Sequence, residues 1–286
     1  MSPSKEEQLW GACFTGDLGA LKSLLAGNST LNVNWAEETR LDSPLHIVCR
    51  LGRLDIVKEL LLLPDLDLNR GNRGRATPFS LACQEGHCEI VLWLLADPRT
   101  DLNIADLDDC VPLWFATQNG HLPVVQHLLA SGRPVRTQVR SSFNNSVPAQ
   151  QGRATCLVGK TAEETEAQFQ RRITSGPVIS DLLDEFEEDP EGVRLRLRRL
   201  PGIREHFVGH TFAIVVFFSD GLARLRRQTR RTPLEVGRFL KVCARLPLEL
   251  QMTVCCRVFG SPKDVVPSRD AESGFQWLAR AAVWKQ

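Results

Sequence analysis

Short amphipathic segments follow one another in pairs through the first 132 residues. In residues 18–25 the leucines 18, 21, 24 and 25 fall on one side of a helix, because residues three and four apart share a face. The second segments of the later pairs end in leucine runs, at 60–62, 94–95 and 128–129. This patterning predicts a series of helical hairpins, each with one apolar side to bury.

The first segments of three pairs begin with the same local pattern. Pro44, Pro78 and Pro112 lie 34 residues apart, and an apolar residue follows each of them. Eight residues after each proline comes a glycine. A fixed period with matched landmarks is the signature of a repeat array. The three versions of the pattern read Ser43-Pro44-Leu45-His46, Thr77-Pro78-Phe79-Ser80 and Val111-Pro112-Leu113-Trp114, with the glycines Gly52, Gly86 and Gly120.

These residues resemble the ankyrin repeat, whose signature is a T-P-L-H-x-A helix start, a G-H turn and a second helix that ends in leucines. The resemblance implies an all-α solenoid of helix-turn-helix units joined by β-turn fingers. Four repeats are expected in residues 1–132, of which the first, from Glu6 to Asn28, is degenerate and polar on its outer side. Ser43 and Thr77 are expected to cap their helices, and His46 to tie neighbouring repeats together.

The pattern changes after Gly132. Residues 133–159 are rich in Arg, Ser, Asn, Gln and Pro, so we expect a long finger or a flexible insertion there. Residues 160–189 resemble a divergent fifth unit, with a capping box at its start, a turn at Gly176 and a second helix over 178–188. The resemblance to ankyrin repeats thus extends over residues 5–189.

Residues 190–286 are expected to form a C-terminal helical domain. Val193, Leu197, Leu200 and Ile203 have helical spacing, although their alternation with arginines also fits a strand. Further helices are expected over residues 212–218, 232–246, 247–259 and 271–284. The domain is similar to a helical region of uncharacterised eukaryotic ankyrin proteins.

Composition points to a protein of the cytoplasm, with the nucleus as the alternative. The most apolar window, 212–218, has seven residues, against the roughly 20 that a membrane-spanning helix needs. The N-terminus lacks the apolar core of a signal peptide. The nine cysteines are therefore expected to be free thiols, and Cys13, Cys49 and Cys83, at matching repeat positions, to be small packing residues.

The sequence predicts no catalytic residues, cofactor or metal, and thus no enzyme. Gly159-Lys160-Thr161 ends like a phosphate-binding loop, but Ala154 stands where that loop needs glycine. Cys83 and His87 lack the further ligands of a zinc site. His206 and His210 are four apart, but Phe207 stands between them where a zinc protease has glutamate.

The family geometry implies that the fingers and the inner helices bind a protein partner. Within them, exposed character and residue type select eight candidates, of which Trp35 stands out because indoles are common among binding hot spots. The predicted function is a non-catalytic adaptor or scaffold. The candidate partner-binding residues are Trp35, Arg70, Arg73, Arg75, Gln84, Asp106, Trp114 and Gln118.

Two alternative functions arise from the second half. Leu246-Pro247-Leu248-Glu249-Leu250 is similar to the start of an F-box, which recruits a ubiquitin-ligase scaffold. Residues 133–286 carry 25 Lys+Arg and 17 Asp+Glu, net +8, so a nucleic-acid-associated regulator is the other alternative. Nucleic acid ranks below a protein partner because no nucleic-acid-binding module is recognisable.

Overall fold

The computed structural model describes residues 3–27, 31–137 and 166–220, and most of 239–275 (239–240, 242–243, 245–263, 265–267, 270–271 and 274–275), with the side chains of 166–173 and of Phe217 left aside. The chain divides into two compact units, Met1–Glu191 and Gly192–Gln286. The described residues are helical wherever they form regular structure, and the chain is an all-α repeat solenoid followed by further helices.

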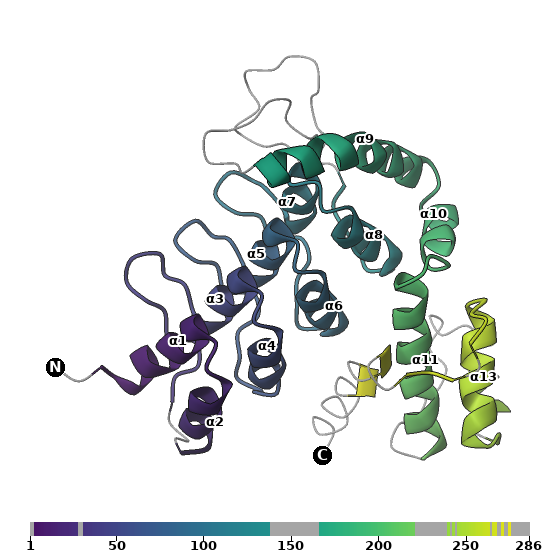
Figure 1. Cartoon of the computed structure of the whole chain (residues 1–286), viewed down its shortest axis with the longest axis horizontal. Helices are drawn as coiled ribbons and strands as arrows, with labels where there is room; N and C mark the ends of the chain where they lie inside the picture. The colour runs from purple at the N-terminus through teal and green to yellow at the C-terminus, as the bar shows by residue number, and fades with distance from the viewer. Residues whose placement is uncertain are drawn as a thin grey trace. The chain divides into compact units, whose positions relative to one another are not determined.

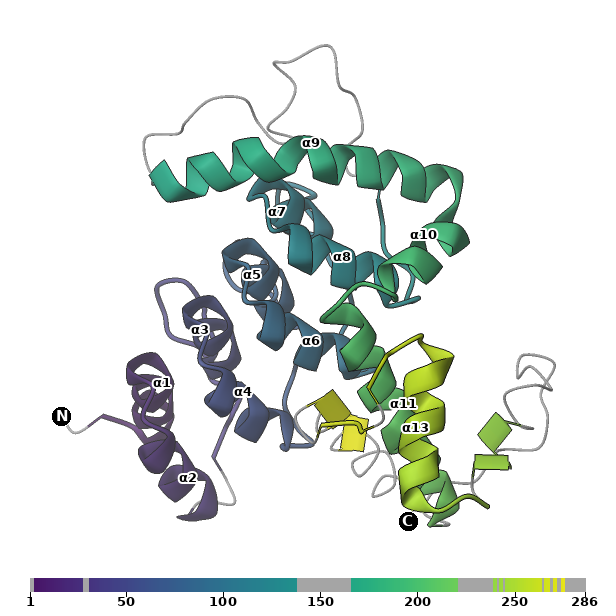
Figure 2. The ribbon, with the colours of Figure 1, turned by 45° about the vertical axis from the view of Figure 1, so that its right-hand side comes forward.

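Eight short helices form two parallel rows in the first unit (Figures 1 and 2). The inner row contains α1 (Lys5–Thr15), α3 (Pro44–Leu51), α5 (Pro78–Glu85) and α7 (Pro112–Gln118). The outer row contains α2 (Leu18–Gly27), α4 (Leu54–Leu61), α6 (Cys88–Ala96) and α8 (Leu122–Ala130). Each inner helix packs against the next inner helix and against its own outer partner.

The starts of the inner helices follow the local chemistry of the sequence. Proline occupies the first turn of α3, α5 and α7, where its missing N–H costs nothing. The Thr77 hydroxyl accepts the Ser80 N–H at 3.1 Å and caps α5. Val111 has no such group, so α7 begins without a side-chain cap.

Glycine ends α1, α3 and α5 in the left-handed conformation, which glycine adopts without a steric penalty. Gly52 has φ 71° and Gly86 has φ 75°. A side chain is excluded there for a second reason: a Cβ on Gly86 would lie 2.3 Å from Nδ1 of His121, and one on Gly52 would lie 2.7 Å from Cε1 of His87. The turn glycines therefore allow a histidine of the following repeat to pack against each turn.

The core lies between the two rows. Leu45, Leu60, Phe79, Leu94 and Leu113 are all fully or almost fully buried. The predicted packing role of the matched cysteines is confirmed, since Cys13, Cys49 and Cys83 have no exposed surface and are free thiols. Burial raises the pKa of Cys13 to about 12, so this thiol stays protonated and unreactive.

Arginine side chains close the C-terminal ends of two outer helices, where backbone carbonyls lack helical partners. Arg99 donates from Nη1 to Leu63 O at 3.3 Å and Pro64 O at 3.2 Å. Arg133, 34 residues later, donates from Nη1 to Leu95 O at 3.0 Å and to Asp97 O at 3.2 Å. Each arginine thus joins its own repeat to the preceding one.

A single long helix, α9 (Glu166–Glu188), packs against both α7 and α8 (Figure 2). The predicted helix-turn-helix unit with a turn at Gly176 is therefore wrong. Gly176 and Pro177 both lie inside the helix. A proline ring clashes partly with the Cβ of the preceding residue. Glycine has no Cβ, so Gly176 reduces this clash. Burial of Ile179, Leu182, Leu183 and Phe186 then stabilises the helix.

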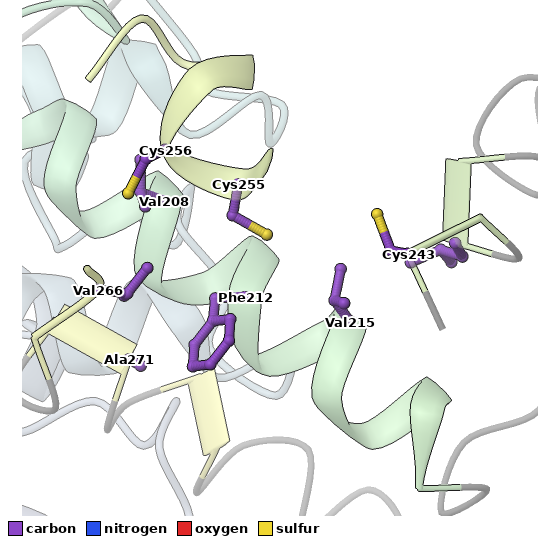
Figure 3. Close-up of a cluster of buried hydrophobic side chains, with 9 residues drawn as sticks. Val208, Phe212, Val215, Cys243, Cys255, Cys256, Val266 and Ala271 are labelled. Carbon is purple, nitrogen blue, oxygen red and sulfur yellow. The ribbon is translucent and has the colours of Figure 1, made fainter. Parts of the chain in front are cut away.

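In the second unit, α11 (Ile203–Ser219) packs against α13 (Leu248–Val258). Val208, Phe212 and Val215 of α11 form a buried cluster with Cys255 and Cys256 of α13 (Figure 3). The helices expected over 212–218 and 247–259 are thus present. The expected helix through Val193 and Ile203 is two helices, because α10 (Pro190–Leu197) ends before Pro201-Gly202 and α11 begins after it.

Several sequence predictions fall outside the described part of the chain. They include most of the insertion 133–159, the capping box at the start of 160–189, and the Gly159 loop. Most of the helices expected over 232–246 and 271–284 also lie there, although residues 239–240 and 242–243 are helical.

Candidate protein-binding surface

Three loops precede α3, α5 and α7 and project side by side from the array (Figure 1). We refer to residues 31–42, 69–76 and 103–110 as finger 1, finger 2 and finger 3. One side chain organises each finger by accepting backbone N–H groups of the turn. Glu37 accepts from Thr39 at 2.6 Å and Arg40 at 2.5 Å, and Asn72 accepts from Gly74 at 3.0 Å and Ala76 at 3.1 Å.

Asp106 does the same in finger 3, where its Oδ1 accepts from the backbone N–H of Asp108 and of Cys110, both at 2.9 Å. The two carboxylates differ in acidity. Burial would raise the pKa of Glu37, but hydrogen bonds from Thr39, Arg40 and Asp42 outweigh it and lower the pKa to about 2. For Asp106 burial prevails over its two hydrogen bonds, and the pKa is raised.

Backbone hydrogen bonds join neighbouring fingers. The Arg73 N–H of finger 2 donates to Arg40 O of finger 1 at 2.8 Å, and the Leu107 N–H of finger 3 donates to Gly74 O of finger 2 at 3.0 Å. The Arg73 guanidinium adds a bond to Glu38 O at 3.0 Å. The fingers therefore form one connected edge with fixed spacing.

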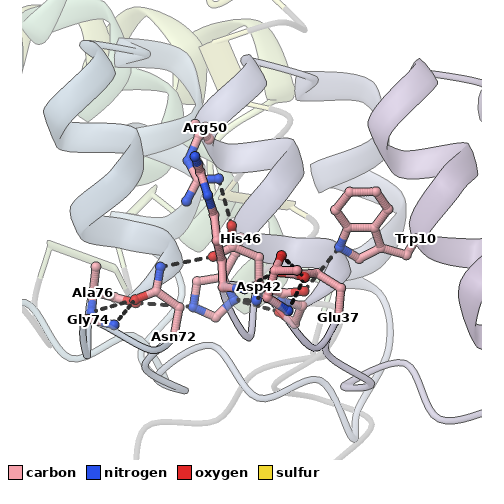
Figure 4. A network of polar contacts seen from close by, with 11 residues as sticks. Trp10, Glu37, Asp42, His46, Arg50, Asn72, Gly74 and Ala76 are labelled. Atoms are coloured by element: carbon pink, nitrogen blue, oxygen red, sulfur yellow. Dashed lines mark hydrogen bonds and ion pairs between the residues drawn. The ribbon is translucent and has the colours of Figure 1, made fainter.

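A buried polar network surrounds Asp42 at the base of finger 1 (Figure 4). Its side chain, 2% exposed, pairs with Arg50 Nη1 at 2.6 Å and accepts from Asn72 Nδ2 at 2.9 Å. Its backbone carbonyl accepts from the Trp10 indole at 3.0 Å. One residue thereby links repeat 1, α3 and finger 2.

His46 links the same region to the next repeat, as predicted. Its Nδ1 accepts from the Ser43 N–H at 3.1 Å, so its Nε2 must carry the proton donated to Ala76 O at 3.1 Å. Burial lowers the pKa of His46 to about 4, against the opposing charge of Asp42. The ring is therefore neutral at physiological pH.

Three asparagines at matching positions, Asn34, Asn69 and Asn103, form a ladder at the base of the fingers. The Asn69 side chain donates to Arg99 O at 2.7 Å and accepts from the Asp101 N–H at 2.8 Å. Asn103 repeats this pattern with Pro134 O at 2.9 Å and the Arg136 N–H at 2.8 Å. The repeat pattern thus continues past α8.

The opposite end of the inner helices has its own connections. His87 Nε2 lies 3.0 Å from Arg50 O, and His121 Nε2 lies 2.9 Å from Gln84 O. Asn119 Nδ2 donates to the same Gln84 carbonyl at 2.9 Å. Repeats 3 and 4 have Ser80 and Trp114 where repeat 2 has His46, and these bonds at the turn connect each of them to the preceding repeat.

The structure separates the eight candidate binding residues into two groups. Arg70, Arg73 and Asp106 bond to the backbone of the fingers; the guanidinium of Arg70 donates to Asn34 O at 2.6 Å. The other five have side chains that are at least partly exposed and carry no such bond: Trp35, Arg75, Gln84, Trp114 and Gln118. The side chains of the first group thus hold the fingers together, and the binding role of all eight residues stays a prediction.

Sequence reasoning missed exposed apolar residues on the inner helices. Phe14 is 50% exposed and stacks on Trp10 with ring centroids 5.5 Å apart, and Leu51 is 39% exposed. Both lie one or two residues before a turn glycine, as Gln84 and Gln118 do. Nearness to a turn glycine was the available signal.

The described residues also bear on metal binding, on the His206–His210 pair and on a membrane-spanning helix. None of them form a group of three or more His, Cys, Asp or Glu suited to a metal. His206 and His210 have ring centroids 4.3 Å apart, and burial lowers the pKa of His210 to about 4. Within the described chain, no helix combines the length and apolar character needed to cross a membrane.

Comparison with known proteins agrees with this architecture. Residues 9–106 match the family model described as ankyrin repeats, in three copies. The structure adds a fourth helical pair, α7 and α8, which lies wholly beyond the matched residues. No curated protein matches the chain.

Residues 9–106 therefore comprise three ankyrin repeats, a type of module that generally mediates protein–protein interaction and is typically non-catalytic.

Proposed function

We propose that the protein is a non-catalytic adaptor that binds a protein partner through its fingers and inner helices. The observation that carries the proposal is the exposure of Phe14 and Leu51 at the solvent-facing ends of α1 and α3. Large apolar side chains that stay exposed near the turn ends of two neighbouring inner helices favour an interaction site there. Trp35, Trp114 and Gln118 add amphipathic contact area on the same inner helices and fingers.

The test is capture of partners by the full chain from cells. We expect Phe14→Ser combined with Leu51→Ser to reduce recovery of specific partners by at least tenfold. Leu62→Ser is the matched control, because Leu62 is 53% exposed but ends an outer helix. Unchanged recovery with a folded double variant would remove the inner helices from the binding site.

The F-box-like alternative is favoured by one observation. The start of α13 exposes Leu248 at 51% and Leu250 at 50%, two apolar residues in the segment that resembles an F-box. Direct binding of the full chain to a purified ubiquitin-ligase scaffold subunit tests it. Loss of that binding in a variant carrying Leu248→Ser and Leu250→Ser would support it, and absence of any binding would eliminate it.

The nucleic-acid alternative is weakened by intramolecular contacts of Arg198 and Arg204. Arg198 lies over the Phe207 ring, 4.8 Å from its centroid, and Arg204 pairs with Glu205 at 3.0 Å. Guanidinium groups engaged in this way are less available to phosphates. Binding of the full chain to duplex and single-stranded nucleic acid across a salt series is the measurement that decides.

A further inference from the structure

The residue before the last position of each finger has an unusual backbone conformation. Leu41, Arg75 and Asp109 have φ angles of 57°, 60° and 59°, and they are the non-glycine residues with positive φ in the described chain. They lie 34 residues apart, so they occupy the same place in three successive fingers. The left-handed conformation is unfavourable for residues that carry a Cβ, whereas glycine adopts it freely.

The side chains at these positions do not explain the strain through contacts within the protein. Leu41 is 39% exposed, and Arg75 and Asp109 are also exposed. In the described residues, the Arg75 guanidinium and the Asp109 carboxylate have no hydrogen bond or ion pair. Arg70 and Arg73 of the same finger differ, because both donate to finger 1. Strained, exposed residues whose side chains stabilise nothing locally point to recognition.

The three positions have a fixed separation. Leu41 and Arg75 directly follow Arg40 and Gly74, whose carbonyls accept the bonds from the next finger. Gly71 packs tightly inside finger 2, where a Cβ would lie 2.9 Å from the Arg75 Cα. The row therefore presents an apolar, a basic and an acidic side chain in that order on a connected edge.

This order defines the chemistry of a complementary ligand. Stacked helices lie roughly 8–10 Å apart, and an extended chain advances about 3.3 Å per residue. Residues three apart in an extended segment can therefore face successive fingers. We infer that Leu41, Arg75 and Asp109 select an extended segment of a partner protein that carries an apolar, an acidic and a basic residue at three-residue intervals. This inference rests on the proposed function and specifies which partner sequence the fingers choose.

The experiment uses displayed random 12-residue peptides selected on the full chain. We expect enrichment of apolar-x-x-acidic-x-x-basic, or of the same order reversed if the segment runs in the opposite direction. Synthetic peptides with this pattern should bind in fluorescence anisotropy at least tenfold more tightly than peptides in which the two charges are exchanged. Failure to select any binder, or selection of binders without this charge order, would overturn the inference.

The decisive experiment exchanges the charges of two row residues, Arg75 and Asp109. Arg75→Asp combined with Asp109→Arg should reverse the preference, so that the charge-exchanged peptide binds better. The matched control is Arg40→Asp combined with Glu38→Arg, which exchanges two exposed finger charges outside the row and should leave the preference unchanged. If both double variants have the same preference, Arg75 and Asp109 do not determine the charge order of the ligand and the inference is wrong.

A stability measurement separates recognition from a structural role. Replacing all three residues with glycine should maintain or raise the melting temperature while reducing peptide affinity at least tenfold. Replacement with alanine should reduce affinity equally without that thermal advantage, since alanine retains the strain. A glycine variant that melts several degrees below the alanine variant would assign the side chains to the fold. If partner capture is lost with the Phe14 and Leu51 variants but unaffected by the charge exchange, the proposed function survives and this inference fails.

Discussion

The junction between repeats 2 and 3 and the junction between repeats 3 and 4 both have a histidine bond at the turn, from His87 and His121, but they differ beside the fingers. In the first, His46, Asp42 and Asn72 form a buried polar network beside the fingers. In the second, Ser80 replaces the histidine and bonds locally to Thr77 O at 2.8 Å, while His121 and Asn119 converge on Gln84 O at the turn. The comparison shows that repeats with the same helix arrangement can be joined by different side-chain hydrogen bonds.

The largest expected effect comes from breaking the network that only the first junction has. Asp42→Ala leaves the Arg50 guanidinium and the Asn72 amide without their acceptor, and we expect it to lower the free energy of unfolding by roughly 3 kcal/mol. Asp42→Asn preserves the shape and should cost less than half as much. Urea denaturation monitored by circular dichroism measures both, and equal effects would show that the charge is unimportant.

The pH dependence of stability should separate the two junctions next. Because the pKa of His46 is about 4 in the folded chain against 6.5 for the free group, the stability it supports is complete above about pH 6.5 and is lost as the pH falls toward 4. The slope contributed by this histidine approaches 1.4 kcal/mol per pH unit within that window.

Unfolding midpoints measured from pH 7 to pH 4 for the wild type and for His46→Gln provide the check. The variant should be less stable at pH 7 but should lose less stability on acidification. His127, whose pKa burial also lowers to about 4, remains in both proteins, so some acid sensitivity persists. Parallel curves would mean that His46 does not titrate in this range.

The connections at the turn should have a smaller effect. His121→Ala removes one of two donors to Gln84 O, and we expect a loss of about 1 kcal/mol. Asn119→Ala should cost a similar amount, and the double variant more than the sum, because the carbonyl then loses both donors. A double-mutant cycle measured by denaturation tests this, and strict additivity would argue that the two donors act independently.

The smallest expected change makes the junctions more alike. Val111→Thr places a hydroxyl where Thr77 caps α5, and we expect α7 to gain about 0.5 kcal/mol. Thr77→Val is the matched reverse substitution and should lose about 1 kcal/mol. Thermal melts of the two variants suffice, and destabilisation by Val111→Thr would show that the hydroxyl finds no partner at that buried position.

The sequence predicted the repeats well because their landmarks are local. Proline, glycine and the leucine runs each determine a helix start, a turn or a buried face without reference to distant residues. Gly176 failed as a turn landmark because the helix that runs through it depends on tertiary packing against α7 and α8, which no local pattern reports. The same limit explains why α9 was predicted as two helices.

The binding surface was less predictable, for a physical reason. An arginine in a finger can face a partner or bond to a neighbouring backbone, and the choice depends on contacts between residues more than 30 positions apart, as with Arg73 and Glu38. Phe14 shows the converse: an apolar residue at helical spacing looks like core until its neighbours are placed. Backbone strain at Leu41 and Arg75 leaves no trace in composition at all.

The helix α9 has one more consequence, for self-association. A stack of repeats presents different surfaces at its two ends, and such surfaces on separate molecules could join head to tail without limit. The far side of α7 and α8 is occupied by α9, which buries Ile179, Leu182 and Phe186. The face of α7 and α8 that α9 covers is therefore closed to the end of a second array unless α9 moves away.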